Sequence, residues 1–202
     1  MPMNLIIFGD RTASEMEAVA HEVYAKDFVR IVKCYVNPDD LTLDPMVEIP
    51  CNRTSKVFYT IGVLELGLKE RIEQMCEAAG YQPWTLIHPT AYVPESAKIG
   101  KGCFIAPHAV IGIEAEIDEH SIIHFHASVG HGAKVGRHCA ILPGARLSGR
   151  VELGDGVLVG SNAFIYQGTK VGERAQIDAL TYVRDDVPPR RVVSVRREPR
   201  AE

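Results

Sequence analysis

The 202-residue sequence lacks the features that mark several classes of protein. It contains no run of about 18 or more apolar residues and no basic segment ahead of its first apolar residues, which argues against a membrane span and a secretory signal. A formal charge of −4 leaves no basic excess for a nucleic-acid surface. We therefore expect a cytoplasmic protein that binds neither membranes nor nucleic acid.

The sequence also lacks an ordered cysteine pattern. Its five cysteines are odd in number and widely separated, which fits neither a disulfide framework nor the C-x-x-C spacing of zinc sites. They are predicted to be reduced thiols in the core: Cys34, Cys51, Cys76, Cys103 and Cys139.

The first 85 residues predict a small α/β unit. Three short apolar runs predict strands, at residues 5–8, 28–36 and 57–61. Two amphipathic segments predict helices, at 12–26, opened by the capping box Thr12-Ala-Ser-Glu15, and at 63–79. This β-α-β-β-α order is similar to half of a nucleotide-binding doubly wound sheet.

From residue 87 onward an aliphatic residue recurs at every sixth position without exception. The residue four beyond each of them is nearly always small. Such a repeat predicts a parallel β-helix in which each hexapeptide forms one face of a triangular prism and the aliphatic side chain points inward. The repeating residues are Ile87, Val93, Ile99, Ile105, Ile111, Ile117, Ile123, Val129, Val135, Ile141, Leu147, Leu153, Val159, Ile165, Val171, Ile177 and Val183.

Two domains follow from the change in periodicity. We predict a Rossmann-like unit over 1–85 and a β-helix of about five coils with a C-terminal tail over 86–202. Known hexapeptide-repeat proteins wind to the left, so the expected fold is α/β followed by a left-handed parallel β-helix. Since each coil has about 18 residues, residues 18 apart should stack about 4.8 Å from each other. His108 should stack with His126, and His120 with His138.

The histidines leave a metal site open as one alternative. His126 and His131, five apart, have the ligand spacing of hexapeptide-repeat carbonic anhydrases, in which two subunits share one zinc ion. For the remaining histidines of the repeat, surface or interface polarity is the plain expectation.

A stretch around His131 resembles a known motif. Residues 129–149, VGHGAKVGRHCAILPGARLSG, look like the core of hexapeptide-repeat sugar acyltransferases of the sialic-acid O-acetyltransferase and nucleotide-amino-sugar N-acetyltransferase family. The specific part is a histidine two past an aliphatic residue, followed by P-G-A-x-L-x-G. The resemblance also covers the Rossmann-like unit, a hinge at 81–90 and a tail at 185–193.

The resemblance implies a function. A homotrimer would move an acetyl group from acetyl-CoA, held between neighbouring β-helices, to an amino or hydroxyl group of a nucleotide-linked sugar, with no metal ion, as in surface polysaccharide biosynthesis. By position, His131 would be the general base and Gly149 the backbone donor to the thioester oxygen.

Binding residues can be assigned on the same basis. The turns after the predicted strands would contact the nucleotide-linked sugar through Gly9, Arg11, Asn37 and Gly62. Because CoA carries several negative charges, cations near the end of the β-helix are candidates for holding it, together with Gly149 near the thioester: Lys170, Arg174, Arg190 and Arg191.

Some positions depart from the family pattern. Gly132 stands where the family has an acidic residue after the histidine, Ala140 stands where it has a second histidine, and Asp10 replaces part of a glycine-rich turn. Two alternatives therefore remain beside the transferase: a divergent trimer that binds a ligand or partner without catalysis, and a zinc-dependent hydrolase.

Overall fold

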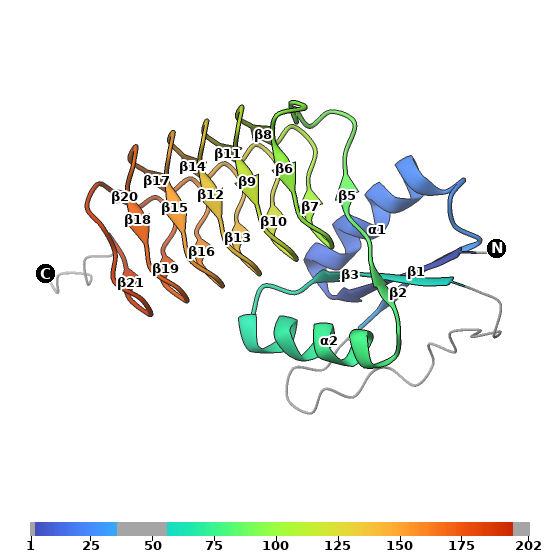
Figure 1. Cartoon of the computed structure of the whole chain (residues 1–202). Coiled ribbons are helices and arrows are strands. Elements are labelled where there is room, and N and C mark those ends of the chain that lie inside the picture. The colour runs from blue at the N-terminus through green and yellow to red at the C-terminus, as the bar shows by residue number, and fades with distance from the viewer. Residues whose placement is uncertain (1–2, 36–55, 196–202) are drawn as a thin grey trace, which may run out of the picture.

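A computed structural model describes residues 3–35 and 56–195 of the chain. It contains an α/β domain and a prism-shaped β-helix (Figure 1). The first domain has a parallel sheet in the order β2-β1-β3-β4. Its strands are β1 (Met3–Gly9), β2 (Arg30–Cys34), β3 (Lys56–Gly62) and β4 (Gln82–Pro83), and its helices are α1 (Arg11–Tyr24) and α2 (Leu66–Ala78).

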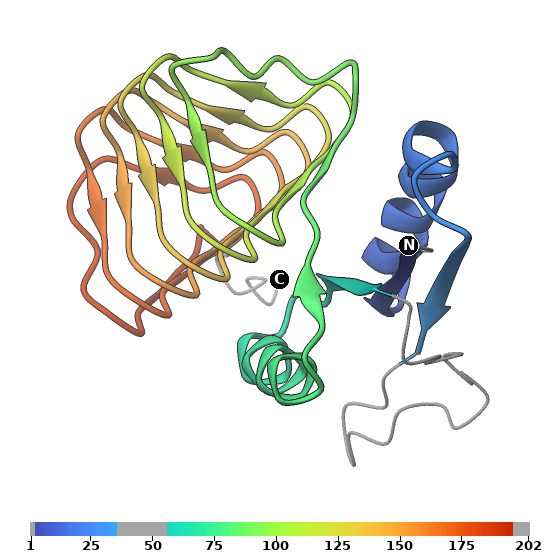
Figure 2. The same ribbon diagram turned by 45° about the vertical axis from the view of Figure 1, so that its right-hand side comes forward.

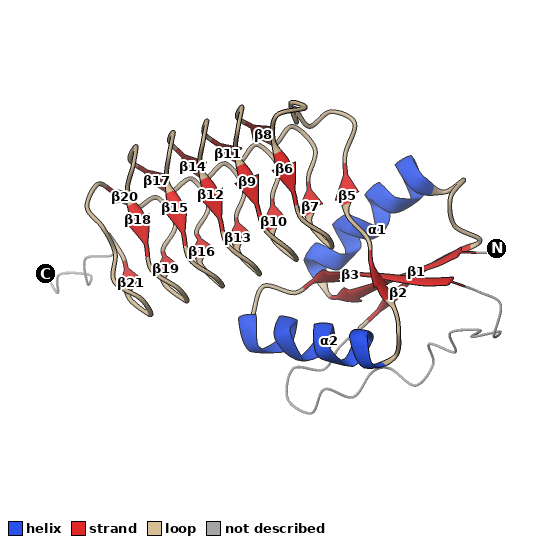
Figure 3. Ribbon diagram, in the orientation of Figure 1, coloured by secondary structure: helices blue, strands red, loops and turns tan. Residues whose placement is uncertain are grey.

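The two helices cover opposite faces of this sheet (Figure 3). Alternate residues of β1 explain the arrangement, since side chains of a strand point to opposite faces. Leu5 and Ile7 pack with the buried side of α1, whereas Ile6 and Phe8 pack with the buried side of α2. No helix within residues 3–35 and 56–195 is long and apolar enough to cross a membrane.

The start of α1 differs from the prediction. The helix begins at Arg11 with Asp10 as its N-cap, and the Asp10 side chain makes no capping hydrogen bond. Thr12 is buried in the first turn rather than capping it. The reason lies in Gly9, whose φ of 133° turns the chain into the helix one residue earlier than the capping box implied.

The hexapeptide repeat forms the predicted left-handed β-helix, with three parallel sheets as the faces of the prism (Figure 2). The docked face, which meets the α/β domain, contains β5 (Leu86–Ile87), β7 (Phe104–Ile105), β10 (Ile122–Ile123), β13 (Ala140–Ile141), β16 (Leu158–Val159), β19 (Gln176–Ile177) and β21 (Val192–Val193).

The aromatic face contains β8 (Val110–Ile111), β11 (Ser128–Val129), β14 (Arg146–Leu147), β17 (Phe164–Ile165) and β20 (Tyr182–Val183). The charged face contains β6 (Lys98–Ile99), β9 (Glu116–Ile117), β12 (Lys134–Val135), β15 (Glu152–Leu153) and β18 (Lys170–Val171).

The predicted 18-residue register is confirmed strand by strand. Ile105 pairs with Ile123, and Ile123 pairs with Ile141. The repeating aliphatic residues and the small residues four beyond them form one continuous core. Both predicted histidine stacks are also present, with ring centroids 5.3 Å apart for His108–His126 and 5.4 Å apart for His120–His138. Four of the cysteines are buried free thiols; Cys51 lies outside the described residues.

The α/β domain packs against the docked face because that face carries apolar side chains on its outside. Leu86, Phe104 and Ile122 join the same buried cluster as Met16 of α1. The Tyr24 hydroxyl adds directional contacts, donating to the Ile87 carbonyl at 3.0 Å and accepting from the Ile87 N–H at 3.1 Å. The domain contact is therefore both apolar and hydrogen-bonded.

Candidate functional site

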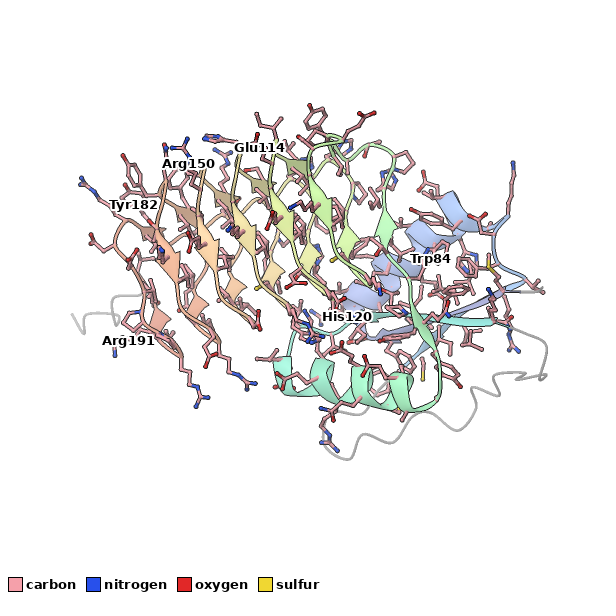
Figure 4. All side chains as sticks on the ribbon, viewed as in Figure 1. Trp84, Glu114, His120, Arg150, Tyr182 and Arg191 are labelled. Atoms are coloured by element: carbon pink, nitrogen blue, oxygen red, sulfur yellow. The ribbon has the colours of Figure 1, made fainter. Side chains whose placement is uncertain are left out.

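The turns of the β-helix stack into columns at the three corners of the prism. The open corner joins the aromatic face to the charged face and includes residues 112–115, 130–133 and 148–151. The α2 corner joins the charged face to the docked face and includes 118–121, 136–139 and 154–157. Figure 4 shows Glu114 and Arg150 of the open corner on the edge of the prism opposite His120 and α2.

His131 lies at the open corner, in the turn between β11 and β12, and is exposed. Its ring rests against Gly149 of the next coil so closely that a Cβ atom at position 149 would overlap the imidazole. Within the described part of the chain, the ring accepts or donates no hydrogen bond, and the Gly149 N–H has no acceptor. The structure thus brings together the two residues that the sequence resemblance paired.

Arg150 occupies the space beside Gly132. Its backbone N–H donates to the His131 carbonyl at 2.9 Å. Its Cγ lies 3.6 Å from the position that a Cβ of Gly132 would take. The place after the histidine, where the family has an acidic side chain, therefore holds the stem of an arginine.

The position of the missing second histidine is also explained. Ala140 lies on the docked face and is 2 % exposed. The corner that carries His131 is on the opposite side of the prism from this face. Within one chain, a side chain at residue 140 cannot share a site with His131.

The four cations proposed for CoA do not gather in one place. Lys170 on the charged face pairs with Glu152 at 3.2 Å, and Arg174 pairs with Glu70 of α2 at 2.8 Å. Arg190 lies 4.0 Å from Glu173. Arg191 lines a hollow of about 280 Å³ at the C-terminal end of the β-helix.

The charged face carries two grooves of about 480 and 450 Å³. Lys134, three residues after His131, lines both grooves, and Lys170 lines the first. Along this face positive and negative side chains alternate from coil to coil, with Lys98 and Glu116 in contact at 2.7 Å. A groove lined by both signs of charge therefore starts beside the open corner.

A separate cavity of about 340 Å³ lies in the α/β domain, at the carboxyl ends of β1 and β3. Gly9, Arg11 and Gly62 line it, as predicted for the acceptor site; Asn37 lies outside the described residues. The glycines are required by close backbone packing, because a Cβ on Gly9 would lie 2.6 Å from the Gly62 carbonyl oxygen.

Carboxylates occupy both helix starts at this cavity. Asp10 is the N-cap of α1. Glu65 is the N-cap of α2, and its carboxylate accepts from the backbone N–H groups of Gly67 at 2.9 Å and Leu68 at 2.6 Å. Helix N-termini are favourable sites for anions, so at α2 that site is already filled by the chain itself.

The α2 corner holds a buried polar cluster that the sequence reading missed. Glu73 of α2 accepts from Arg137 at 2.7 Å and contacts Nε2 of His138 at 2.8 Å and Nε2 of His120 at 3.3 Å. Lys69, fully buried one helical turn earlier, donates to the His138 carbonyl at 3.0 Å. This cluster joins the two domains rather than forming an open site.

Burial dominates the ionisation of these groups. It lowers the pKa of Lys69 to about 8, of His120 to about 3 and of His138 to about 4, with nearby cations adding to the effect on the histidines. Burial also raises the pKa of Glu73, against the attraction of Arg137. Both histidines are therefore neutral near pH 7 and can donate from Nε2 to Glu73.

A signal for this cluster exists in the sequence. Along α2 the residues that pack on the sheet are Leu68, Ile72 and Cys76. Lys69 and Glu73 form a second stripe four residues apart, beside the apolar one. Two buried stripes on one helix indicate two packing surfaces.

The histidines weighed for a metal site are not brought together. His126 stacks on His108 at the third corner, and His131 lies at the open corner. Across residues 3–35 and 56–195, no group of three or more histidine, cysteine or acidic side chains is placed to hold a metal ion.

Comparisons with known proteins agree with this architecture. Residues 150–184 match a family model described as the hexapeptide repeat of succinyl-transferase. No curated protein matches the sequence.

Solved structures match nearly the whole chain. The acetyltransferase domain of PglB from Neisseria gonorrhoeae FA1090, in complex with acetyl coenzyme A, is 23 % identical, with a TM-score of 0.78 over 95 % of this chain and 96 % of that one. PerB from Caulobacter crescentus, in complex with CoA and GDP-perosamine, is 20 % identical, with a TM-score of 0.79 over 92 % and 91 %.

A third structure, WeeI from Acinetobacter baumannii AYE, is 16 % identical, with a TM-score of 0.78 over 93 % of this chain and 94 % of that one. The similarity to all three runs through both domains, because each alignment spans more than nine-tenths of both chains. The resemblance seen in the sequence is thus confirmed at the level of the fold: this chain has the architecture of the hexapeptide-repeat sugar acetyltransferases, an α/β domain followed by a left-handed β-helix.

Proposed function

We propose that this protein is an acetyltransferase that moves the acetyl group of acetyl-CoA to an amino or hydroxyl group of a nucleotide-linked sugar. The observation that carries the proposal is the contact between His131 and Gly149 at the open corner. The shared fold with PglB, in complex with acetyl coenzyme A, and with PerB, in complex with CoA and GDP-perosamine, supports it.

The chemistry assigns one role to each residue. The acceptor nitrogen or oxygen attacks the thioester carbonyl carbon while the exposed imidazole of His131 takes its proton. The Gly149 N–H donates to the carbonyl oxygen as negative charge develops there. The C–S bond then breaks, and the CoA thiolate leaves and is protonated. Gly149 suits this role because a side chain there would displace the base.

The acceptor is proposed to bind in the cavity of residues 1–85, where Gly9, Arg11 and Gly62 meet, with Asn37 as a further contact. Acetyl-CoA is proposed to lie along the groove that starts at Lys134 on the charged face of the 86–202 domain. Lys170 and Arg191 are the predicted cations still placed to meet its phosphates, because Arg174 is held by Glu70. No metal ion takes part.

Assembly into a homotrimer is part of the proposal. The acceptor cavity borders the docked face, and His131 lies on the opposite corner of the same prism, so one chain cannot join them. The aromatic face, next to the open corner, leaves large apolar side chains uncovered, including Phe164 and Tyr182, the latter 56 % exposed. Packing another copy against this face would place a second cavity near His131.

The test is thiol release from acetyl-CoA with UDP- and GDP-linked amino sugars as acceptors. We expect turnover by the full chain and a loss of at least about 100-fold in His131→Ala, the contribution typical of a general base. His108→Ala, an exposed histidine at another corner, is the matched control and should retain full activity.

Unchanged turnover in His131→Ala would remove this residue from the mechanism. Absence of thiol release together with no binding of CoA by calorimetry would favour a non-catalytic trimer, and one zinc ion per chain by elemental analysis would favour the hydrolase. A chain that sediments as a monomer at micromolar concentration would refute the shared site.

A further inference from the structure

Arg150 stands out among the cations of the β-helix by its position. Its backbone follows Gly149, its N–H donates to the His131 carbonyl, and its stem covers Gly132. The guanidinium therefore starts within one side chain's reach of both proposed reacting groups. Figure 4 shows it projecting from the open edge of the prism.

This arginine is also not engaged by the protein itself. Other long cations of the β-helix have acidic partners: Lys98 pairs with Glu116, Arg137 with Glu73 and Lys170 with Glu152. In the described ranges Arg150 makes no ion pair and no side-chain hydrogen bond, and it is exposed. Glu114, in the same column, lies two coils or about 10 Å from it along the prism.

The charge of CoA does not account for Arg150. If the thioester lies at His131 and Gly149, the phosphates of CoA are at the far end of its extended pantetheine arm. A side chain beside the thioester cannot also reach them. An anion next to the reacting centre must therefore belong to the acceptor.

The acceptor cavity points the same way. Both helix starts that border it carry a carboxylate, Asp10 at α1 and Glu65 at α2, with Arg11 as the single cation among its lining residues. An acidic acceptor would meet a net negative lining there. Its negative charge would be better matched by a guanidinium, which binds phosphate and carboxylate groups through paired hydrogen bonds.

We propose that Arg150 binds an anionic group of the acceptor, a phosphate or a carboxylate close to the sugar ring that is acylated, and so selects acidic acceptors. The inference rests on the proposed function, because it places the acceptor at His131. Gly132 has a part in it, since an acidic side chain at that position would compete for the guanidinium.

The test compares three probes on the full-length protein: glucosamine, glucosamine 1-phosphate and glucosaminuronic acid. Calorimetry in the presence of CoA gives the dissociation constants. We expect at least one of the anionic probes to bind about tenfold more tightly than glucosamine. Arg150→Gln should abolish this preference, and Arg150→Lys should retain part of it, because the charge remains without the paired donors.

Lys101→Gln is the matched control, since Lys101 is an exposed cation of the β-helix at the α2 corner. It should leave the preference unchanged. Tighter binding of the phosphate would indicate a sugar phosphate or nucleotide-linked acceptor, and tighter binding of the carboxylate an acidic sugar. Equal binding of all three probes by the unaltered protein would refute the inference, as would an Arg150→Gln effect on CoA affinity alone.

Thiol release with the same probes separates this inference from the proposed function. If charged and uncharged probes are acetylated with the same kcat/KM, the role of Arg150 fails and acyl transfer stands. If the anionic preference depends on Arg150 but no acceptor releases thiol, acyl transfer fails and the anion site stands.

Discussion

The open corner and the α2 corner of the β-helix carry histidines of the same repeat in opposite surroundings. At the α2 corner, His120 and His138 stack on each other, are buried under α2 and contact Glu73. At the open corner, His131 is exposed, rests on a glycine and has no partner among the described residues. A buried imidazole with fixed partners joins domains, and an exposed one is free to take a proton.

The spacing of α2 explains why its corner is closed. Leu66, Lys69 and Glu73 follow one another at about one helical turn, or 5.4 Å, while the coils they contact repeat every 4.8 Å or so. The helix can thus contact successive coils, with Leu66 over Gly156, Lys69 on the His138 carbonyl and Glu73 on the His120 ring. No helix covers the open corner (Figure 1).

The largest expected effect separates the two kinds of histidine. His131→Ala should lower kcat by about 10² to 10⁴ with no change in melting temperature, because the ring is exposed and unpartnered. His138→Ala should do the reverse, lowering the melting temperature while the folded fraction retains its kcat. Thermal melts and thiol-release kinetics on the same samples make the comparison, which fails if both variants lose activity equally.

Removal of the central carboxylate tests the closed corner. Glu73→Ala should lower the free energy of unfolding by about 3 kcal/mol, because it leaves Arg137 and two buried imidazoles without their acceptor. Glu152→Ala breaks a pair on the exposed charged face and should cost less than about 1 kcal/mol. Denaturant titration measures both; similar costs would mean that the cluster does not hold α2.

Two glycines allow a matched test of the space around each histidine. A Cβ on Gly102 would overlap the buried His120 ring, and its φ of 69° also disfavours a side chain. We expect Gly102→Ala to cost about 2 kcal/mol of stability and to leave kcat unchanged. Gly149→Ala, which displaces the exposed His131 ring, should lower kcat about tenfold or more with little change in stability. The opposite result would reverse the roles of the corners.

Acidification gives the smallest predicted effect and acts on the α2 corner alone. The folded-state pKa values of His120 and His138 lie below the ordinary value of 6.5, so the unfolded chain binds more protons and stability falls as pH falls through 6.5 toward 4. The raised pKa of Glu73 opposes this in part. Between pH 7 and pH 5 we expect a loss of about 2 kcal/mol, measured as the urea midpoint. A midpoint that does not move would mean the imidazoles are not buried.

Much of the fold could be read from local pattern. The six-residue period predicted each strand pair of the prism because every repeat meets the same neighbour 18 residues away. It also predicted both histidine stacks, which follow from register alone. The capping box at Thr12 failed because a turn forced by the contact of Gly9 with Gly62 overrides a local capping preference.

The site could be predicted in part. His131 and Gly149 were paired by a sequence motif, and they lie in contact because they are 18 residues apart. The four cations assigned to CoA could not be sorted from the sequence. Whether an exposed arginine is free or held depends on what packs beside it, as with Arg174 and Glu70 of α2.

The sequence by itself determined the prism, its register and the residues at each corner, because these depend on a period that every coil repeats. Only the tertiary structure decided which corner is open. The packing of α2 along one column of turns buries Lys69, Glu73, His120 and His138 together, and this rests on contacts between residues about 45 to 70 positions apart. It leaves His131 and Arg150 on the far edge, where a ligand can reach them.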